Sequence, residues 1–128
     1  MSTKNVVDSS GWLEYFTDGK TAAFFAPAIE DTEKLLVPVI TIYEVFKKVL
    51  RERGENAALQ IAAMMQSGQV IALDSTLALD AARHPLPLAD SIIYATALRH
   101  GAILWTQDEH FKDLPQVKYS AKRSPTSR

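Results

Sequence analysis

The chain has 128 residues, of which 47% are hydrophobic and 23% charged, so we expect one globular domain rather than a fibre or a disordered chain. The net charge of −1 predicts neither nucleic-acid binding nor its absence. Cysteine is absent, which excludes disulfides, thiolate metal sites and cysteine nucleophiles. No apolar run approaches the roughly 20 residues that span a bilayer, and the first residues do not form a signal peptide, so we expect a cytoplasmic protein without membrane association.

The first half of the chain alternates short apolar runs with helical patterns. A buried strand is expected at residues 5–8, and Ser9 or Ser10 is expected to cap the helix that follows. The clearest helix covers residues 39–53, because its apolar residues recur with the spacing of one helical face. The other elements predicted here are a helix over residues 21–29, a strand over 35–37 closed by Pro38, and a helix over 56–66.

The second half continues this alternation. Helices are predicted at residues 75–83, capped by Asp74 or Ser75, and at residues 88–100, stopped by Gly101. Residues 120–128 carry basic residues and no acid, and we expect them to form a flexible tail after a single domain at residues 1–119. Strands are predicted at residues 70–73, 102–105 and 117–119.

Strands of continuous apolar residues, separated by helices, predict an α/β fold with a mostly parallel sheet covered on both faces. Sites in such sheets form outside the carboxyl ends of the strands. Asp8 ends the first strand, and Asp108 follows the strand over residues 102–105. If those two strands are neighbours, the two carboxylates meet at one edge of the sheet.

Two further acids are candidates, and each also has a simpler explanation. Glu44 lies beside the apolar face of its helix, where it could instead form an ion pair with Lys47 or Lys48. Asp90 lies in the first turn of its helix, where an acid is favourable near the positive end of the helix dipole or as a cap.

Acids that converge in this way would form a site for a hard cation. Mg²⁺ and Mn²⁺ prefer oxygen ligands, and without a cation two carboxylates about 4 Å apart repel by about 4 kcal/mol at an effective dielectric of 20. A phosphodiester nuclease uses such a cation to activate water and to neutralise charge on the phosphate. Basic residues beside Glu44 form either a solvated helix face or a surface that contacts phosphates without reading sequence. These residues are Lys47, Lys48, Arg51 and Arg53.

Four segments carry the candidate acids. Residues 6–10 contain a strand that ends in an acid, and residues 39–45 contain the helix with its glutamate. Residues 86–97 place an aspartate at the head of a helix of small residues, which is the most specific of these patterns. Residues 104–111 contain a strand followed by Thr, Asp and Phe. In this order they resemble the motifs of the PIN-domain family, and within it the VapC toxins of toxin–antitoxin pairs, over residues 5 to about 119.

The resemblance implies a PIN-like three-layer α/β/α fold over residues 1–119. It further implies a ribonuclease that cleaves RNA endonucleolytically with a metal-activated water, acts as a homodimer and is held inactive by a cognate antitoxin. Thr106 is expected to hydrogen-bond a carboxylate of the metal site. By the same resemblance, the residues that bind Mg²⁺, or Mn²⁺, and catalyse the reaction are Asp8, Glu44, Asp90 and Asp108.

Several alternatives stay open in the sequence. A non-catalytic PIN-like module would bind nucleic acid or protein, although the intact set of four acids counts against it. A phosphoacceptor domain would have paired acids at the first strand and a lysine after a late strand, and this chain has neither. A metal-free ribonuclease would need two of the three histidines, His84, His100 and His110. Glu109 or Asp113 could also assist the site, but we expect Asp108 to face the metal.

Overall fold

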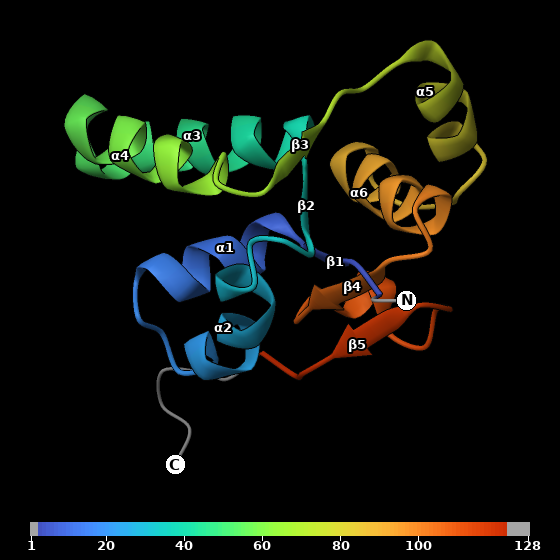
Figure 1. Cartoon of the computed structure of the whole chain (residues 1–128), viewed down its shortest axis with the longest axis horizontal. Helices are drawn as coiled ribbons and strands as arrows, with labels where there is room; N and C mark the ends of the chain where they lie inside the picture. The colour runs from blue at the N-terminus through green and yellow to red at the C-terminus, as the bar shows by residue number, and fades with distance from the viewer. Residues whose placement is uncertain (1–2, 123–128) are drawn as a thin grey trace.

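The computed structural model describes residues 3–122, in which strands and helices alternate as predicted (Figure 1). Most boundaries lie within one or two residues of the predicted ones. The strands are β1 (Asn5–Val7), β2 (Leu35–Pro38), β3 (Gln69–Ile71), β4 (Ile103–Thr106) and β5 (Val117–Tyr119). The helices are α1 (Ser9–Phe16), α2 (Ala22–Glu30), α3 (Val39–Arg53), α4 (Glu55–Met65), α5 (Ser75–Ala82), α6 (Leu88–Arg99) and the 3₁₀ turn η1 (Glu109–Phe111). Residues 123–128 of the predicted tail lie outside the described residues.

The strands form one sheet in the order β3-β2-β1-β4-β5, and every neighbouring pair is parallel. In the register, Val7 of β1 lies beside Trp105 of β4, and Thr106 of β4 lies beside Tyr119 of β5. The carboxyl ends of these three strands therefore share one edge of the sheet. The prediction of an α/β fold with a parallel sheet is confirmed, and β1 and β4 are the neighbours that a meeting of Asp8 and Asp108 requires.

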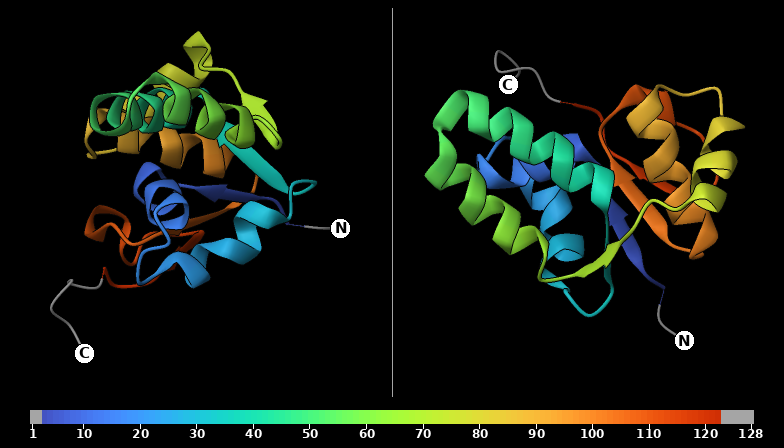
Figure 2. Two further views of the ribbon diagram at one scale, coloured as in Figure 1. Left: turned by 90° about the vertical axis from the view of Figure 1, so that its left-hand side faces the viewer. Right: turned by 90° about the horizontal axis from the view of Figure 1, so that it is seen from above.

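Helices cover both faces of the sheet. Successive side chains of a strand point to opposite faces, so neighbouring residues of one strand contact different helices. Val7 and Leu35 pack with α1 and α2, whereas Val6 and Leu36 pack with α6. The three-layer arrangement predicted from the sequence is therefore confirmed (Figure 1). Beside these layers, α3 and α4 lie next to each other as a hairpin that packs against α1 (Figure 2). None of the helices among residues 3–122 has the length and apolar composition needed to cross a bilayer.

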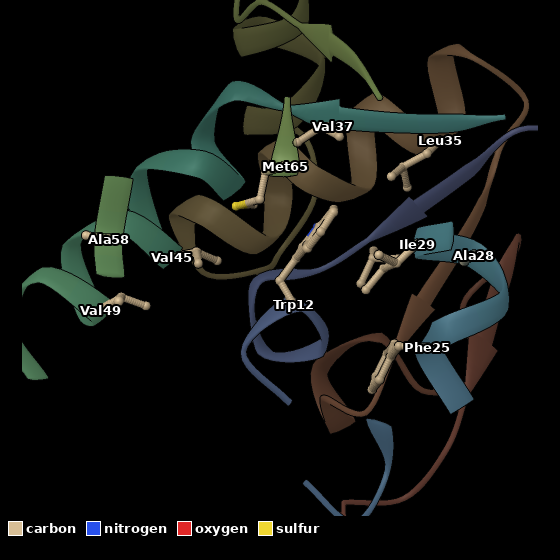
Figure 3. Packing of buried hydrophobic residues seen from close by; sticks show 11 residues of the cluster. Trp12, Phe25, Ala28, Ile29, Leu35, Val37, Val45, Val49, Ala58 and Met65 are labelled. Atoms are coloured by element: carbon tan, nitrogen blue, oxygen red, sulfur yellow. The ribbon is translucent and has the colours of Figure 1, made fainter. Parts of the chain in front are cut away.

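The larger core cluster is built around Trp12 of α1, which is 1% exposed. Figure 3 shows its indole among side chains of β2, α2 and the α3–α4 hairpin, including Val37, Ile29 and Met65. This cluster fixes α1, and with it the position of Asp8 just before that helix.

Helix α6 is enclosed on several sides, and its residues Ser91 to Ala97 are all buried. Ile93 and Tyr94 pack on the sheet, while Ile92 and Ala95 pack against α5. A helix enclosed in this way has little freedom to move, so Asp90 in its first turn is held on a rigid element.

The strand predicted at residues 70–73 is shorter than expected. The observed strand, β3, lies at the edge of the sheet and pairs only with β2, and Val70 is 40% exposed. An apolar run in the sequence does not distinguish an edge strand from a central one, because that difference depends on the number of neighbours.

Gly11 allows α1 to lie close against the sheet and α2. A Cβ atom at this position would lie 2.6 Å from Cε1 of Phe25 and 2.7 Å from Cγ1 of Val7.

We predict that Gly11→Ala lowers the free energy of unfolding by about 1–3 kcal/mol, because overpacking a filled core costs about that much. Urea denaturation measures the loss. The double variant Gly11→Ala/Phe25→Leu should lose less than the sum of the two single variants, and strict additivity would contradict this account.

Candidate functional site

The first acid of the site, Asp8, directly follows β1 and precedes α1. It is 3% exposed, and its Oδ1 atom accepts a 2.9 Å hydrogen bond from the backbone N–H of Gly11. The Ser10 hydroxyl lies 3.2 Å from each carboxylate oxygen. Asp8 is therefore the helix cap, and the prediction that Ser9 or Ser10 has this role was wrong. The reason is that Asp8 keeps the extended backbone that a cap needs, whereas both serines are already helical.

The hydroxyl of Thr106 joins β4 to Asp8. It donates a 2.6 Å hydrogen bond to Oδ2 of Asp8 and accepts a 2.9 Å hydrogen bond from the backbone N–H of Asp108. Thr106 is fully buried. A single side chain thus holds one carboxylate and the backbone of a second acid, and the predicted hydrogen bond of Thr106 to an acid of the site is present.

Asp90 and Asp108 come together through His110. Its Nδ1 atom lies 3.0 Å from Oδ2 of Asp90 and 3.1 Å from Oδ1 of Asp108. The backbone N–H of His110 donates a further 2.9 Å hydrogen bond to the same Asp108 oxygen, which caps the turn η1. One ligand atom from each of these three residues lies within 4.8 Å of the other two, so the group can hold one metal ion.

Glu44 faces α1 rather than the lysines of its own helix. Its Oε1 atom accepts a 2.5 Å hydrogen bond from the hydroxyl of Ser9. Lys48 instead forms a 2.9 Å ion pair with Glu52, and Lys47 donates to the Tyr43 hydroxyl over 3.4 Å. The simpler explanation for Glu44, an ion pair along its helix, therefore does not describe its position.

The simpler explanation for Asp90 holds only in part, because Asp90 lies in the first turn of α6 but does not cap it. Pro87 takes the cap position of α6, and among the described residues no side chain forms a capping hydrogen bond there. The carboxylate of Asp90 is directed to His110 instead. Placement near the positive end of α6 still favours the ionised form of Asp90, but this effect alone does not account for the contact with His110.

The four predicted acids do not all lie within one ligand sphere. Among residues 3–122, the group close enough to share an ion contains Asp90, Asp108 and His110, but not Asp8 or Glu44. Asp8 is tied to this group through Thr106, and Glu44 acts on Asp90 through its charge. The structure therefore brings two of the acids together directly and places the other two next to them.

The charges of the site are only partly balanced. The pKa of Asp8 is raised from its ordinary value of 3.8 to about 6. Burial is the main cause and the charge of Asp108 adds to it, while the hydrogen bonds from Thr106 and Gly11 act in the opposite direction. The pKa of Asp90 is raised by burial, then by the negative charge of Asp108 and, less strongly, of Glu44. The pKa of His110 is raised mainly by the charge of Asp108. The negative charge of Asp108 contributes to all three raised pKa values. A cation bound nearby would lower the pKa of each group.

Two residues of the site were missed in the sequence. His110 was treated as one of three scattered histidines, although its place two residues after Asp108 is a signal for contact with that acid. Ser9 was considered only as a helix cap, and its bond to Glu44 joins residues 35 positions apart, which no local pattern reveals.

The remaining candidates lie elsewhere or face solvent. His84 packs edge-on against Tyr94, and His100 ends α6 as expected. Glu109 and Asp113 are exposed and do not belong to the group of ligand atoms found in the described part of the chain. In the described part of the chain, His110 is the histidine grouped with the acids of the site, whereas His84 and His100 do not belong to that group.

This chain is similar to a family model and to several solved structures. A model of the PIN-domain family matches residues 6–117. No curated protein matches the sequence. A chain of a toxin–antitoxin complex from Klebsiella pneumoniae has 22% identity and a TM-score of 0.72, with 91% of this chain and 96% of that chain covered. A chain of the DNA-bound VapBC complex from Salmonella typhimurium has 14% identity and a TM-score of 0.71, with 94% and 98% covered. A sarcin-ricin-loop-cleaving VapC toxin of Mycobacterium tuberculosis has 18% identity and a TM-score of 0.71, with 88% and 95% covered. At these identities the three likenesses show a shared fold.

The raised pKa of Asp8 predicts how its charge affects stability. Between its ordinary value of 3.8 and about 6, the folded protein holds the Asp8 proton more tightly than the unfolded chain does, so stability falls as pH rises through this window. In EDTA, we predict that Asp8→Asn becomes more stable relative to wild type by roughly 2 kcal/mol between about pH 4 and pH 7, since one pKa unit corresponds to about 1.4 kcal/mol. Urea denaturation over this range measures the difference.

Asp74 provides a matched control for this prediction. It caps α5 in the same way as Asp8 caps α1, but it is exposed, and the backbone N–H of Leu77 and the nearby Arg99 lower its pKa. Asp74→Asn should therefore lose stability relative to wild type as pH rises. A stability difference between Asp8→Asn and wild type that does not change with pH would contradict the argument.

Proposed function

Because this chain belongs to the PIN-domain family, we propose that it is a divalent-metal-dependent endoribonuclease and the toxin of a toxin–antitoxin pair. The observation that carries the proposal is the meeting of Asp90 and Asp108 at the carboxyl edge of the sheet, with Asp8 and Glu44 beside them. We place the nuclease domain at residues 1–119, with residues 120–128 as a basic tail, in a cytoplasmic protein.

The residues present suit a divalent cation. Mg²⁺ and Mn²⁺ take carboxylate oxygens, which Asp90 and Asp108 supply within 4.8 Å of each other. Burial and then the like charge of Asp108 raise the pKa of Asp90, so a cation would relieve a repulsion that exists in the metal-free protein. The imidazole of His110 is a ligand type that Mn²⁺ accepts more readily than Mg²⁺.

Each residue of the site has a role that follows from its position. Asp90 and Asp108 would hold the ion, and Thr106 fixes Asp8 and the backbone of Asp108 at their shared edge. Ser9 orients the carboxylate of Glu44 from the first turn of α1. When bound, the metal would activate the attacking water and neutralise charge on the scissile phosphate. No side chain needs to form a covalent intermediate in this scheme.

The proposed partners follow from the same likeness. Two of the similar structures are complexes of toxin and antitoxin, and one of these is bound to DNA. We infer that this chain is a homodimer and that a cognate antitoxin holds it inactive. The similar toxin from Mycobacterium tuberculosis cleaves the sarcin-ricin loop, so we expect RNA as the substrate here as well.

Cleavage of purified RNA tests the function. We predict that the wild-type protein, freed of any co-purified antitoxin, cleaves total RNA into discrete fragments with Mg²⁺ or Mn²⁺ and not with EDTA. Asp90→Asn should reduce the rate by about 100-fold or more, since loss of one charge-stabilising group in an active site costs about that much. Gel electrophoresis of labelled RNA follows both.

Asp74→Asn is the control, because it makes the same substitution at the exposed cap of α5. It should cleave RNA like wild type. If cleavage survives EDTA, the metal mechanism is wrong. If the wild type binds RNA but does not cleave it under any metal condition, the chain is a binding module instead of a nuclease.

Metal binding can also be detected without any substrate. A ligand present at 100 times its dissociation constant, and bound only by the folded state, raises the free energy of unfolding by about 2.7 kcal/mol. We predict such a rise on adding Mn²⁺ to the wild type and its loss in Asp90→Asn. In EDTA the same variant should be more stable than wild type by roughly 1 kcal/mol, because one of the repelling charges is gone. Thermal melting measures both effects, and equal Mn²⁺ stabilisation of the two proteins would contradict a role of Asp90 as ligand.

A further inference from the structure

A cavity of about 630 Å³ lies beside the metal centre, at the carboxyl ends of β4 and β5. Its lining includes Asp108 and His110, so it is continuous with the proposed ligands. The same cavity is also lined by Lys112, Tyr119 and Lys122, which have no part in holding the metal. A molecule held at the metal centre would therefore extend naturally into a space with an aromatic ring and two ammonium groups.

Tyr119 is placed there by the register of the sheet. It is the last residue of β5 and lies directly beside Thr106 of β4, the residue that holds Asp8. The next residue, Ser120, donates its backbone N–H to the Thr106 carbonyl over 3.0 Å, which fixes the end of β5. Strands β4 and β5 are neighbours (Figure 1), and adjacent strands lie about 4.8 Å apart, so the backbone of Tyr119 is one strand away from Thr106. Tyr119 is half-buried and keeps part of its side chain open to the cavity.

Lys112 and Lys122 bring positive charge next to the acids of the proposed metal site. Four acids lie in or beside the centre, and such a surface repels the phosphates of a polynucleotide unless basic groups stand nearby. Lys112 and Lys122 are exposed, and Nζ of Lys112 lies 5.7 Å from the centre of the Tyr119 ring. An ammonium at this distance interacts weakly with the ring and remains available to an anion.

We propose that this cavity is a nucleotide subsite next to the scissile phosphate, in which Tyr119 stacks one base of a single-stranded RNA while Lys112 and Lys122 contact its phosphates. The inference rests on the proposed ribonuclease function and assigns three residues of this chain to contact the RNA on one side of the cleaved bond. Stacking on a tyrosine needs a free base face, which a paired base in a helix does not offer. Recognition by stacking and phosphate contact is tolerant of sequence, so the subsite selects single-stranded character rather than a particular base.

Binding of a short fluorescein-labelled single-stranded RNA in EDTA, followed by fluorescence anisotropy, tests the subsite without cleavage. Tyr119→Ala should weaken binding about tenfold, within the range found for loss of one base–aromatic stack. Tyr119→Phe keeps the ring and should bind like wild type. Lys112→Gln should reduce the slope of log K against log salt by about 0.7, the value for one phosphate contact to a single strand.

Lys34→Gln is the matched control for charge. Lys34 immediately precedes β2 at the opposite edge of the sheet, where it lies 3.9 Å from Asp31. This variant should bind RNA like wild type and leave the salt slope unchanged. Melting curves of each variant identify any loss of fold, and because Lys112 is exposed, Lys112→Gln tests the subsite even if Tyr119→Ala unfolds.

The outcomes separate this inference from the proposed function. If the wild type cleaves RNA with metal, and both Tyr119→Ala and Lys112→Gln bind the probe as it does, the subsite is wrong and the nuclease stands. If Lys34→Gln weakens binding as much as Lys112→Gln, the contact is non-specific attraction and the subsite is again wrong. If the wild type neither binds nor cleaves any RNA, the ribonuclease function fails and the subsite fails with it.

Discussion

The site depends on a buried hydrogen bond between two neighbouring strands, from the Thr106 hydroxyl to the Asp8 carboxylate. Because β1 and β4 are adjacent and parallel, their last residues reach the same edge of the sheet, and this bond joins them there. The Thr106 oxygen also accepts from the backbone of Asp108, so the direction in which the chain leaves β4 is set by the same group. A buried carboxylate is tolerated at this point because each of its oxygens has a hydrogen-bond donor.

A second constraint is the repulsion between acids of the site, which rigid elements of the fold hold in place. Asp90 and Asp108 repel each other, yet each is attached to a well-fixed element, the enclosed helix α6 and the turn η1. His110 lies between them and offsets part of the repulsion, and its own pKa rises as a result. The site is therefore organised before any ligand arrives, which is the condition under which electrostatic groups are most effective in catalysis.

Much of this arrangement follows from local sequence. The continuous apolar strands and the periodic helix over residues 39–53 specify an α/β fold, and parallel strands bring Asp8 and Asp108 to one edge. The pattern of strands and helices in the sequence does not predict which distant segments contact each other. Ser9 reaches Glu44 only because the larger core cluster packs α1 against α3, and His110 reaches Asp90 only because of how the turn η1 lies beside α6. The cap of α1 was misassigned because three adjacent polar residues, Asp8, Ser9 and Ser10, are equally suitable by type, and only the backbone conformation distinguishes them.

The run of seven buried residues in α6 also bears on how this protein can evolve. A larger or charged side chain at any of these positions would disturb the sheet or α5, so the helix that carries Asp90 tolerates little substitution. By contrast, Lys112 and Lys122 of the neighbouring cavity are exposed, and exposed side chains can change without loss of the core. In the proposed nuclease, the chemistry is thus inherited with the scaffold, while the phosphate contacts depend on residues that selection can change one at a time.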